Sequence, residues 1–381
     1  MSCDSVDRRE VSQTVNDNSN GNGVFTSSRP FLVSQRLQLS PNTEHIPDNY
    51  DDLQLEFSPS VFRSLERYLP PNLLSVSRDV KVQYIREILA RYLPEGERFQ
   101  KLRRYRQQII SRYQPLHREL YTLNPGKFFA PSFIKAVSGN TEESLRSIIS
   151  EPSPGIYTFE MLQPSFCELL LSEVENFEKW VNETKIKIMH PNSMTSYGAV
   201  LDDFGLETML DKLMEDFICP ISRVFFPEVG GFTLDSHHGF VVHYGKDWAV
   251  DLGLHVDDSE VTLNVCLGNQ FSGGEQYFGG IRCDKHMNTR IEPEETLDYS
   301  QVPGKAVLYH GHHRHGARAT TAGHRINLIL WCRSSVFREM KEYQKKNSSW
   351  CEWCQHEKKE RQLQSVSATK LELFKMEESR V

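Results

Sequence analysis

The sequence predicts an α+β protein whose core is built from short strands and covered by helices. Residues 232–333 form short β-branched or aromatic segments bounded by Gly or Pro, the pattern of strands and turns. Many such strands indicate a sandwich, barrel or jelly roll. Upstream, residues 165–181 and 205–218 place apolar side chains on one helical face. Helices that precede strands in this way predict a helical layer on one outer face of the β-core.

The N-terminal part divides into two predicted regions. Residues 1–45 are rich in Ser, Asn, Asp and Gln and lack periodic apolar residues, so we expect a disordered tail. Residues 46–125 are predicted to form a helical module, with apolar residues recurring at helical spacing through Leu89. Its last part, residues 98–118, predicts a basic amphipathic helix. That helix either packs on its neighbours with a solvated basic face or offers a surface to acidic partners such as nucleic acid or chromatin.

The remainder divides into three more regions. Residues 126–154 hold many Pro, Gly and Ser residues and are interpreted as a linker. Residues 155–338 are predicted to form the main domain, whose metal-binding core covers 235–335. Within it, the polar insertion at about 282–300 is long for a hairpin loop and is a candidate lid. The charged tail, 339–381, is expected to be partly ordered at most. The predicted strands are GIYTFEM, GFVVHYG, VTLNVCLG, GKAVLYHG and RINLILWC.

Composition narrows the classes of protein that fit. The formal net charge of −7 argues against bulk nucleic-acid binding through overall charge, so direct contact would have to use the basic helix at 98–118. No apolar run approaches the roughly 18 residues of a membrane helix. The first residues lack the basic and apolar regions of a secretory signal. The eight scattered cysteines therefore predict reduced thiols in a nuclear or cytoplasmic protein, with the nucleus favoured, and not a secreted one.

Three residues carry the main chemical signal. His255 and Asp257 are two residues apart in an extended segment, so both side chains point to the same side. The third is His315, which precedes Gly316; His313 in the same His-rich stretch is the alternative. Two histidines and one carboxylate are the facial triad of a non-haem Fe(II) oxygenase, which leaves three coordination positions open. We therefore predict that His255, Asp257 and His315 are metal ligands and catalytic residues.

A second group of residues predicts the binding of an organic acid beside this metal. Arg325 stands ten residues after His315, and its planar guanidinium can bind a carboxylate such as the remote one of 2-oxoglutarate bidentately. Tyr244 ends the strand before His255 and is a candidate hydrogen-bond donor to 2-oxoglutarate or a core residue. Asn264 lies on the polar face of a predicted strand and could line the cavity.

The stretch HVDDSEVTLNVCLG…FSGGEQYF…VPGKAVLYHGHHRHGARATTAGHRINLILW resembles the catalytic domain of the prolyl and lysyl hydroxylases, especially the procollagen lysyl hydroxylase type. The likeness covers roughly residues 235–335. It implies a distorted double-stranded β-helix and a domain that uses Fe(II), 2-oxoglutarate as co-substrate and L-ascorbate as reductant. It also implies that His255, Asp257 and His315 hold the iron and that Arg325 holds 2-oxoglutarate.

The resemblance implies a dioxygenase that produces succinate and CO2 while it oxidises a side chain of a protein. Without a secretory signal, collagen is not the expected substrate. We expect lysyl or prolyl hydroxylation, or N-methyl-lysine demethylation, of an intracellular protein such as a histone or other nuclear protein. The alternative from a different class is a non-catalytic jelly-roll module that serves as a scaffold in a nuclear complex. The ligand set is intact, which favours the enzyme.

The tail contains a second, weaker metal signal. Cys351 and Cys354, with His356 nearby, resemble half of a zinc site. The other half is missing from the neighbouring sequence unless Cys332 contributes. Ordinary thiols in a mobile tail remain the simpler expectation.

Overall fold

The computed structural model describes residues 36–53, 57–90, 93–192, 194–195, 197–245, 251–268, 271–343 and 350–378. Most of the predicted disordered tail, residues 1–35, lies outside this set. Its last part is not disordered, because Leu37 is buried and the Gln38 backbone N–H donates to the Tyr68 carbonyl. No helix in the described part of the chain is both long and apolar enough to cross a membrane.

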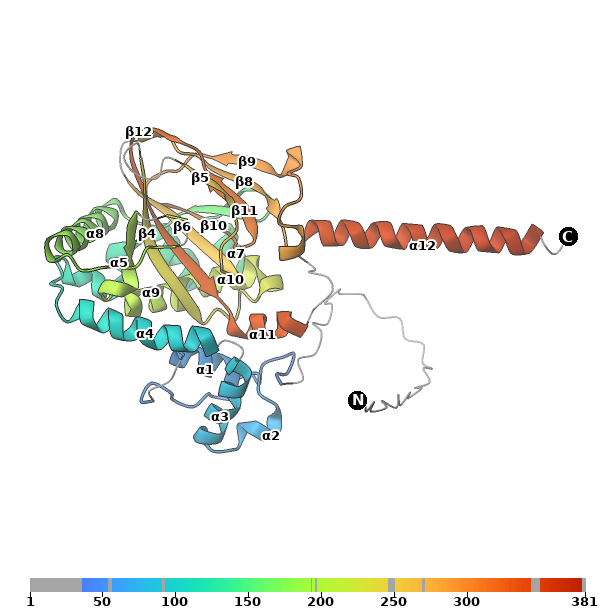
Figure 1. The fold of residues 1–381 in the computed structure, drawn as a ribbon, viewed down its shortest axis with the longest axis horizontal. Coiled ribbons are helices and arrows are strands. Elements are labelled where there is room, and N and C mark those ends of the chain that lie inside the picture. Colours follow the sequence, from blue (N-terminus) through green and yellow to red (C-terminus); the bar gives the residue numbers. More distant parts are fainter. Residues whose placement is uncertain are drawn as a thin grey trace, which may run out of the picture. The chain divides into compact units, whose positions relative to one another are not determined.

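The core is a double-stranded β-helix made from two antiparallel sheets (Figure 1). The larger sheet has the order β1-β2-β10-β6-β12-β4-β3, and β7 pairs with β12. The smaller sheet has the order β5-β11-β8-β9. The larger-sheet strands are β1 (Ser150–Ser153), β2 (Ile156–Glu160), β3 (Gly198–Val200), β4 (Ser236–Gly245), β6 (Val261–Gly268), β7 (Phe271–Gly273), β10 (Lys305–His310) and β12 (Thr320–Arg333); the smaller-sheet strands are β5 (Leu252–His255), β8 (Gln276–Ile281), β9 (Thr296–Tyr299) and β11 (His313–Ala317).

Apolar side chains from both sheets fill the space between them. One cluster joins Phe240 and Ile329 of the larger sheet to Ala317 of the smaller sheet. A second joins Val307 of β10 to Phe278 of β8. Side chains alternate between the two faces of a strand, so the residues next to these inward-facing ones point to the opposite face of the sheet.

Helices cover that opposite face of the larger sheet (Figure 1). Contacts join α8 to β6, α9 to β4 and α6 to β2. At Gly239 of β4 the approach is so close that a Cβ atom would have to displace the end of the Leu210 side chain of α9. The predicted helical layer is therefore confirmed. It comprises α4 (Leu93–Ile110), α5 (Pro125–Phe128), α6 (Pro131–Gly139), α7 (Glu142–Arg146), α8 (Pro164–Thr184), α9 (Glu207–Leu213), the π-helical turn η4 (Met214–Ile218) and α10 (Cys219–Phe225), with short 3-10 turns η2 (Arg118–Tyr121), η3 (Leu201–Phe204) and η5 (Pro227–Val229).

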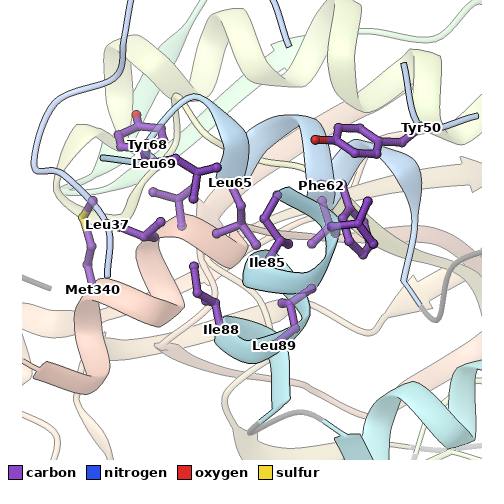
Figure 2. Close-up of a cluster of buried hydrophobic side chains, with 13 residues drawn as sticks. Leu37, Tyr50, Phe62, Leu65, Tyr68, Leu69, Ile85, Ile88, Leu89 and Met340 are labelled. Atoms are coloured by element: carbon purple, nitrogen blue, oxygen red, sulfur yellow. The ribbon is translucent and has the colours of Figure 1, made fainter. Parts of the chain in front are cut away.

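The N-terminal helices α1 (Pro59–Glu66), α2 (Pro71–Leu74) and α3 (Arg78–Leu89) form a cluster of their own. Figure 2 shows Leu37 beside Met340 of α11 (Ser335–Tyr343). Phe62, Leu65 and Ile85 belong to the same buried cluster, so this module packs on the helix that follows the last strand of the β-core. At its side, the buried Glu66 carboxylate accepts a hydrogen bond from Lys81 Nζ at 2.7 Å. A paired, hydrogen-bonded charge of this kind is tolerated in a core.

Three expectations about segments were wrong. Residues 126–154 are not an extended linker, because they contain α5, α6, α7 and β1. The basic helix does not continue to 118, because α4 ends at Ile110. The tail is more ordered than expected, because α12 (Glu352–Glu378) is a 27-residue helix and both Cys351 and Cys354 are buried.

Candidate metal centre

The three predicted ligands lie together between the two sheets. His255 ends β5 and stands opposite His315 in the ladder between β5 and β11. Asp257 follows two residues later, and its backbone N–H donates to the Gly311 carbonyl at 2.8 Å. The carboxylate lies 3.7 Å from His255 Nε2 and 3.5 Å from His315 Nε2. The ligand atoms of all three residues are within 4.8 Å of one another, so one ion could contact all of them.

Hydrogen bonds orient both imidazoles for metal binding. His255 Nδ1 lies 2.8 Å from the Gly253 carbonyl, and His315 Nδ1 lies 2.9 Å from the His313 carbonyl. A carbonyl can only accept, so each Nδ1 carries the proton and each Nε2 keeps its lone pair. This backbone support fixes the tautomer that a metal ligand requires.

Burial shifts the pKa values of the three predicted ligands. It lowers the pKa of His255 to about 4, with the neighbouring His315 adding to the effect, and lowers the pKa of His315 to about 4. Burial also raises the pKa of Asp257 to about 6, although His255 and a hydrogen bond from Thr262 oppose the shift. At neutral pH both imidazoles are therefore neutral and the carboxyl is ionised, which is the state that binds a divalent metal.

Arg325 lies in the same pocket and has no acidic partner there. Its side chain is buried, its guanidinium lies 4.1 Å from the centre of the Tyr244 ring, and its Nη1 donates to the Gly274 carbonyl at 2.6 Å. Among the described residues, no carboxylate pairs with it and its Nε has no acceptor. A buried cation in this condition is costly unless an anion joins it.

The pocket is partly open, and the empty space of about 380 Å³ at this site includes open solvent. It brings all six predicted site residues together, since Tyr244 and Asn264 line it with Arg325 and the three ligands. Asn264 Oδ1 accepts a hydrogen bond from Asn327 at 2.5 Å. His313 is not part of the ligand group; its ring packs against Phe278.

Two further polar residues at this site were missed in the sequence. The Tyr309 hydroxyl lies 3.2 Å from His315 Nε2 and 3.4 Å from Asp257 Oδ2. Gln276 lines the pocket, and its Nε2 has no partner among the described residues. Tyr309 was detectable in principle, because it shares the inward face of its strand with Val307. Gln276 carried no such signal.

The basic helix, suggested as a partner surface, and the 282–300 insertion, suggested as a lid, both make internal contacts. Arg106 of α4 is buried and forms ion pairs with Asp202, Asp203 and Glu207, so part of the basic helix binds internal acids. The 282–300 insertion is held in place, because Arg314 donates to the Met287 and Thr289 carbonyls within it.

Comparisons with known proteins agree with this architecture. Residues 236–334 match the 2OG-Fe(II) oxygenase superfamily, and residues 109–231 match the OGFOD2-like domain. The second match lies upstream of residues 235–335, to which the resemblance in the sequence was confined.

Several relatives match beyond the core. The chain is 59% identical to the 2-oxoglutarate and iron-dependent oxygenase domain-containing protein CP2 of Arabidopsis thaliana, over 97% of this chain and 98% of that one. It is 33% identical to the human 2-oxoglutarate and iron-dependent oxygenase domain-containing protein 2, over 68% of this chain and 75% of that one. It is 26% identical to procollagen-lysine,2-oxoglutarate 5-dioxygenase 1 of Gallus gallus, over 51% of this chain and 26% of that one. The chain therefore belongs to the 2-oxoglutarate and iron-dependent oxygenase domain-containing proteins, an OGFOD2-like branch of the 2OG-Fe(II) oxygenase superfamily.

Proposed function

We propose that the protein is a dioxygenase that uses Fe(II) and 2-oxoglutarate to oxidise a side chain of a protein substrate. The observation that carries the proposal is the presence, in one pocket, of a two-histidine, one-carboxylate group and a buried arginine to which no described carboxylate is paired. Superfamily membership implies both the metal and the co-substrate.

The residues present fit Fe(II). His255 and His315 present lone pairs on Nε2, and Asp257 presents an oxygen between them. These three would hold the metal as a facial triad, leaving open positions for the co-substrate and O2. Thr262 and Tyr309 act through Asp257, because their hydroxyls hydrogen-bond to Oδ2 and fix the carboxylate.

The same pocket fits 2-oxoglutarate. The unpaired Nε of Arg325 is available to the remote carboxylate of the co-substrate, and the Tyr244 ring holds the guanidinium in place. When bound, iron and 2-oxoglutarate supply the oxidant as the co-substrate is converted to succinate and CO2, and L-ascorbate would keep the iron reduced. The chain contributes position and exclusion of water through the apolar walls formed by Phe240 and Ile329.

The substrate is proposed to be a lysyl, prolyl or N-methyl-lysyl residue of a nuclear or cytoplasmic protein. The distant likeness to a procollagen-lysine dioxygenase supports amino-acid side-chain oxidation. The exposed Lys101, Arg103 and Arg104 of α4 could contact an acidic partner. Hydroxylation and oxidative demethylation would use the same pocket, but in demethylation the oxidised carbon is an N-methyl group, and the resulting hemiaminal releases formaldehyde.

The test is an anaerobic titration of metal-free protein with Fe(II) and 2-oxoglutarate, monitored through the visible charge-transfer band of their chelate. We expect the band in the wild type and in the control Asp298→Ala, which removes an exposed carboxylate outside the pocket. We expect no band and no succinate formation in Asp257→Ala. Undiminished succinate formation by Asp257→Ala would refute the ligand assignment, and a folded wild type without the band would favour a non-catalytic scaffold.

A further inference from the structure

We propose that Cys283, His286, Cys351 and Cys354 form a structural zinc site that fastens the start of α12 to the insertion after β8. Cys283 precedes the 3-10 turn η6 (Asp284–His286), which His286 ends. Cys351 precedes α12, and Cys354 lies in its first turn. All four side chains are buried, and their ligand atoms lie within 4.8 Å of one another.

Four distances within this group match a tetrahedral ion. With zinc–sulfur bonds of about 2.3 Å and zinc–nitrogen bonds of about 2.0–2.1 Å, tetrahedral geometry places sulfurs about 3.8 Å apart and sulfur about 3.5 Å from nitrogen. Cys283 Sγ and Cys354 Sγ are 3.6 Å apart. His286 Nδ1 lies 3.4 Å from Cys283 Sγ and 3.5 Å from both Cys351 Sγ and Cys354 Sγ.

The surroundings of His286 support the same conclusion. Its Nε2 lies 3.0 Å from Glu357 Oε1, which places the proton on Nε2 and leaves the Nδ1 lone pair directed at the three sulfurs. A carboxylate behind a ligating imidazole is a recurrent partner in zinc sites. Lys285 binds the other oxygen of Glu357 at 2.7 Å and so holds that carboxylate in position.

A disulfide, a hard cation and a catalytic metal each fit the cluster less well than a structural zinc. A disulfide would require sulfurs about 2.05 Å apart, and none of the three cysteines is in a disulfide. Three thiols and one imidazole are soft donors that select zinc over the harder cations preferred by carboxylates. Four protein ligands also fill a tetrahedron, which is the mark of a structural site, because a catalytic zinc keeps one position open.

The site joins two segments that are 65 residues apart in the sequence between His286 and Cys351. Beside it, the Trp350 ring packs 4.7 Å from the ring of His310, which ends β10, and 5.1 Å from the ring of His312, in the turn before β11. The zinc site therefore also supports the turn that leads into His315. Beyond Glu357 and Lys358, the described side chains of α12 are exposed through Lys370, so the cluster is the main attachment of this helix.

The first test is the zinc content of the full-length protein after dialysis against a mild chelator. We expect about one zinc per chain. Because the facial triad can also take zinc, Asp257→Ala is measured in parallel and should retain that zinc. Cys354→Ser and His286→Ala should each lose most of it. Two matched controls should retain it: Cys219→Ser, a thiol outside the cluster, and His356→Ala, an exposed histidine of α12.

A second test uses only the wild-type protein and so does not depend on the folding of any variant. Cobalt(II) is loaded into the metal-free protein, and its visible spectrum is recorded. A tetrahedral site rich in thiolates gives intense ligand-field bands and a thiolate charge-transfer band, whereas the triad contains no sulfur. We also expect a mercurial reagent that titrates thiols to release the zinc, and trypsin to cleave near Lys358 faster once it is released.

The outcomes separate this proposal from the oxygenase proposal. Zinc loss in Cys354→Ser with zinc retention in Asp257→Ala supports the structural site whatever the enzyme does. A folded wild type that holds no zinc, gives no thiolate–cobalt bands and exposes three freely titrating thiols overturns the proposal, and the iron chelate band would be unaffected by that result.

Discussion

Replacement of Arg325 is the sharpest test of how the pocket binds its co-substrate. The side chain is buried, lies against Tyr244 and donates to the Gly274 carbonyl, and its Nε has no acceptor among the described residues. Arg325→Ala removes the charge and the planar donor group together. Arg325→Lys keeps the charge but cannot form two parallel hydrogen bonds.

The magnitude follows from the bonds that are lost. A hydrogen bond to a charged group contributes about 1.5–3 kcal/mol, so two such bonds to a carboxylate contribute about 3–6 kcal/mol. Since about 1.4 kcal/mol corresponds to a factor of ten, Arg325→Ala should weaken 2-oxoglutarate binding by about 10²–10⁴-fold. Arg325→Lys should fall between the wild type and Arg325→Ala. Iron affinity should change little, because Arg325 is not among the three ligands.

The assay titrates 2-oxoglutarate into Fe(II)-loaded protein without oxygen and follows the chelate band, with iron affinity measured separately. The matched control is Arg318→Ala, which removes an exposed arginine paired with Asp298 at the turn before β12. Unchanged 2-oxoglutarate affinity in Arg325→Ala would show that another group binds the remote carboxylate. A parallel loss of iron affinity would show that the substitution damages the pocket as a whole.

Two further predictions concern pH and the N-terminal module. Because burial raises the pKa of Asp257 to about 6, protons compete with Fe(II) for this carboxylate below that pH. The affinity for Fe(II) should be constant above about pH 6 and fall about tenfold per pH unit below it. The fall should be steeper near pH 4, where His255 and His315 also protonate. A titration with Mn(II) as a redox-stable probe checks this, and pH-independent affinity between 5 and 7 would contradict it. Phe62→Ala opens a cavity in the cluster of Figure 2 and should lower the free energy of unfolding, measured in urea, by about 3–5 kcal/mol. The control Val80→Ala, at an exposed position, should change this free energy little. Equal effects of the two substitutions would contradict the packing.

The sequence was informative where the two-residue alternation of side chains along a strand determines which residues face the pocket. The predicted strand VTLNVCLG is β6, because its β-branched and aliphatic residues suit a strand buried on both faces. Arg325 and Ile329 face the pocket as the alternation within RINLILWC requires. His255 and Asp257 could be predicted to point to the same side, because side chains two residues apart in an extended segment lie on one face.

The sequence was less informative where structure depends on distant partners. Residues 126–154 looked like a linker because Pro125 and Pro131 suggest loops, yet proline is equally suited to the first turn of a helix, and both begin one. The second half of the zinc ligand set was sought near Cys351, at His356 and Cys332. The structure supplies Cys283 and His286 from the 282–300 insertion, which only the fold brings close. The lid interpretation of that insertion remains a prediction, and its anchoring is a reason to expect limited motion.

The two ligand groups differ in their donor atoms and in the number of coordination positions they leave open, and these differences indicate different functions. Imidazole and carboxylate suit Fe(II), whereas thiolates suit zinc, so each group selects its own metal in the presence of the other. The triad leaves room for ligands inside a pocket that also contains Arg325. The Cys283 group has four protein ligands and no position for a substrate. Any catalysis is therefore expected at the triad. The proposed zinc site would affect the triad indirectly, because it positions Trp350, which contacts His310 and His312 just before the strand that carries His315. Zinc removal should thus reduce stability and loosen α12 first, and alter the iron chelate band only if the turn before β11 moves.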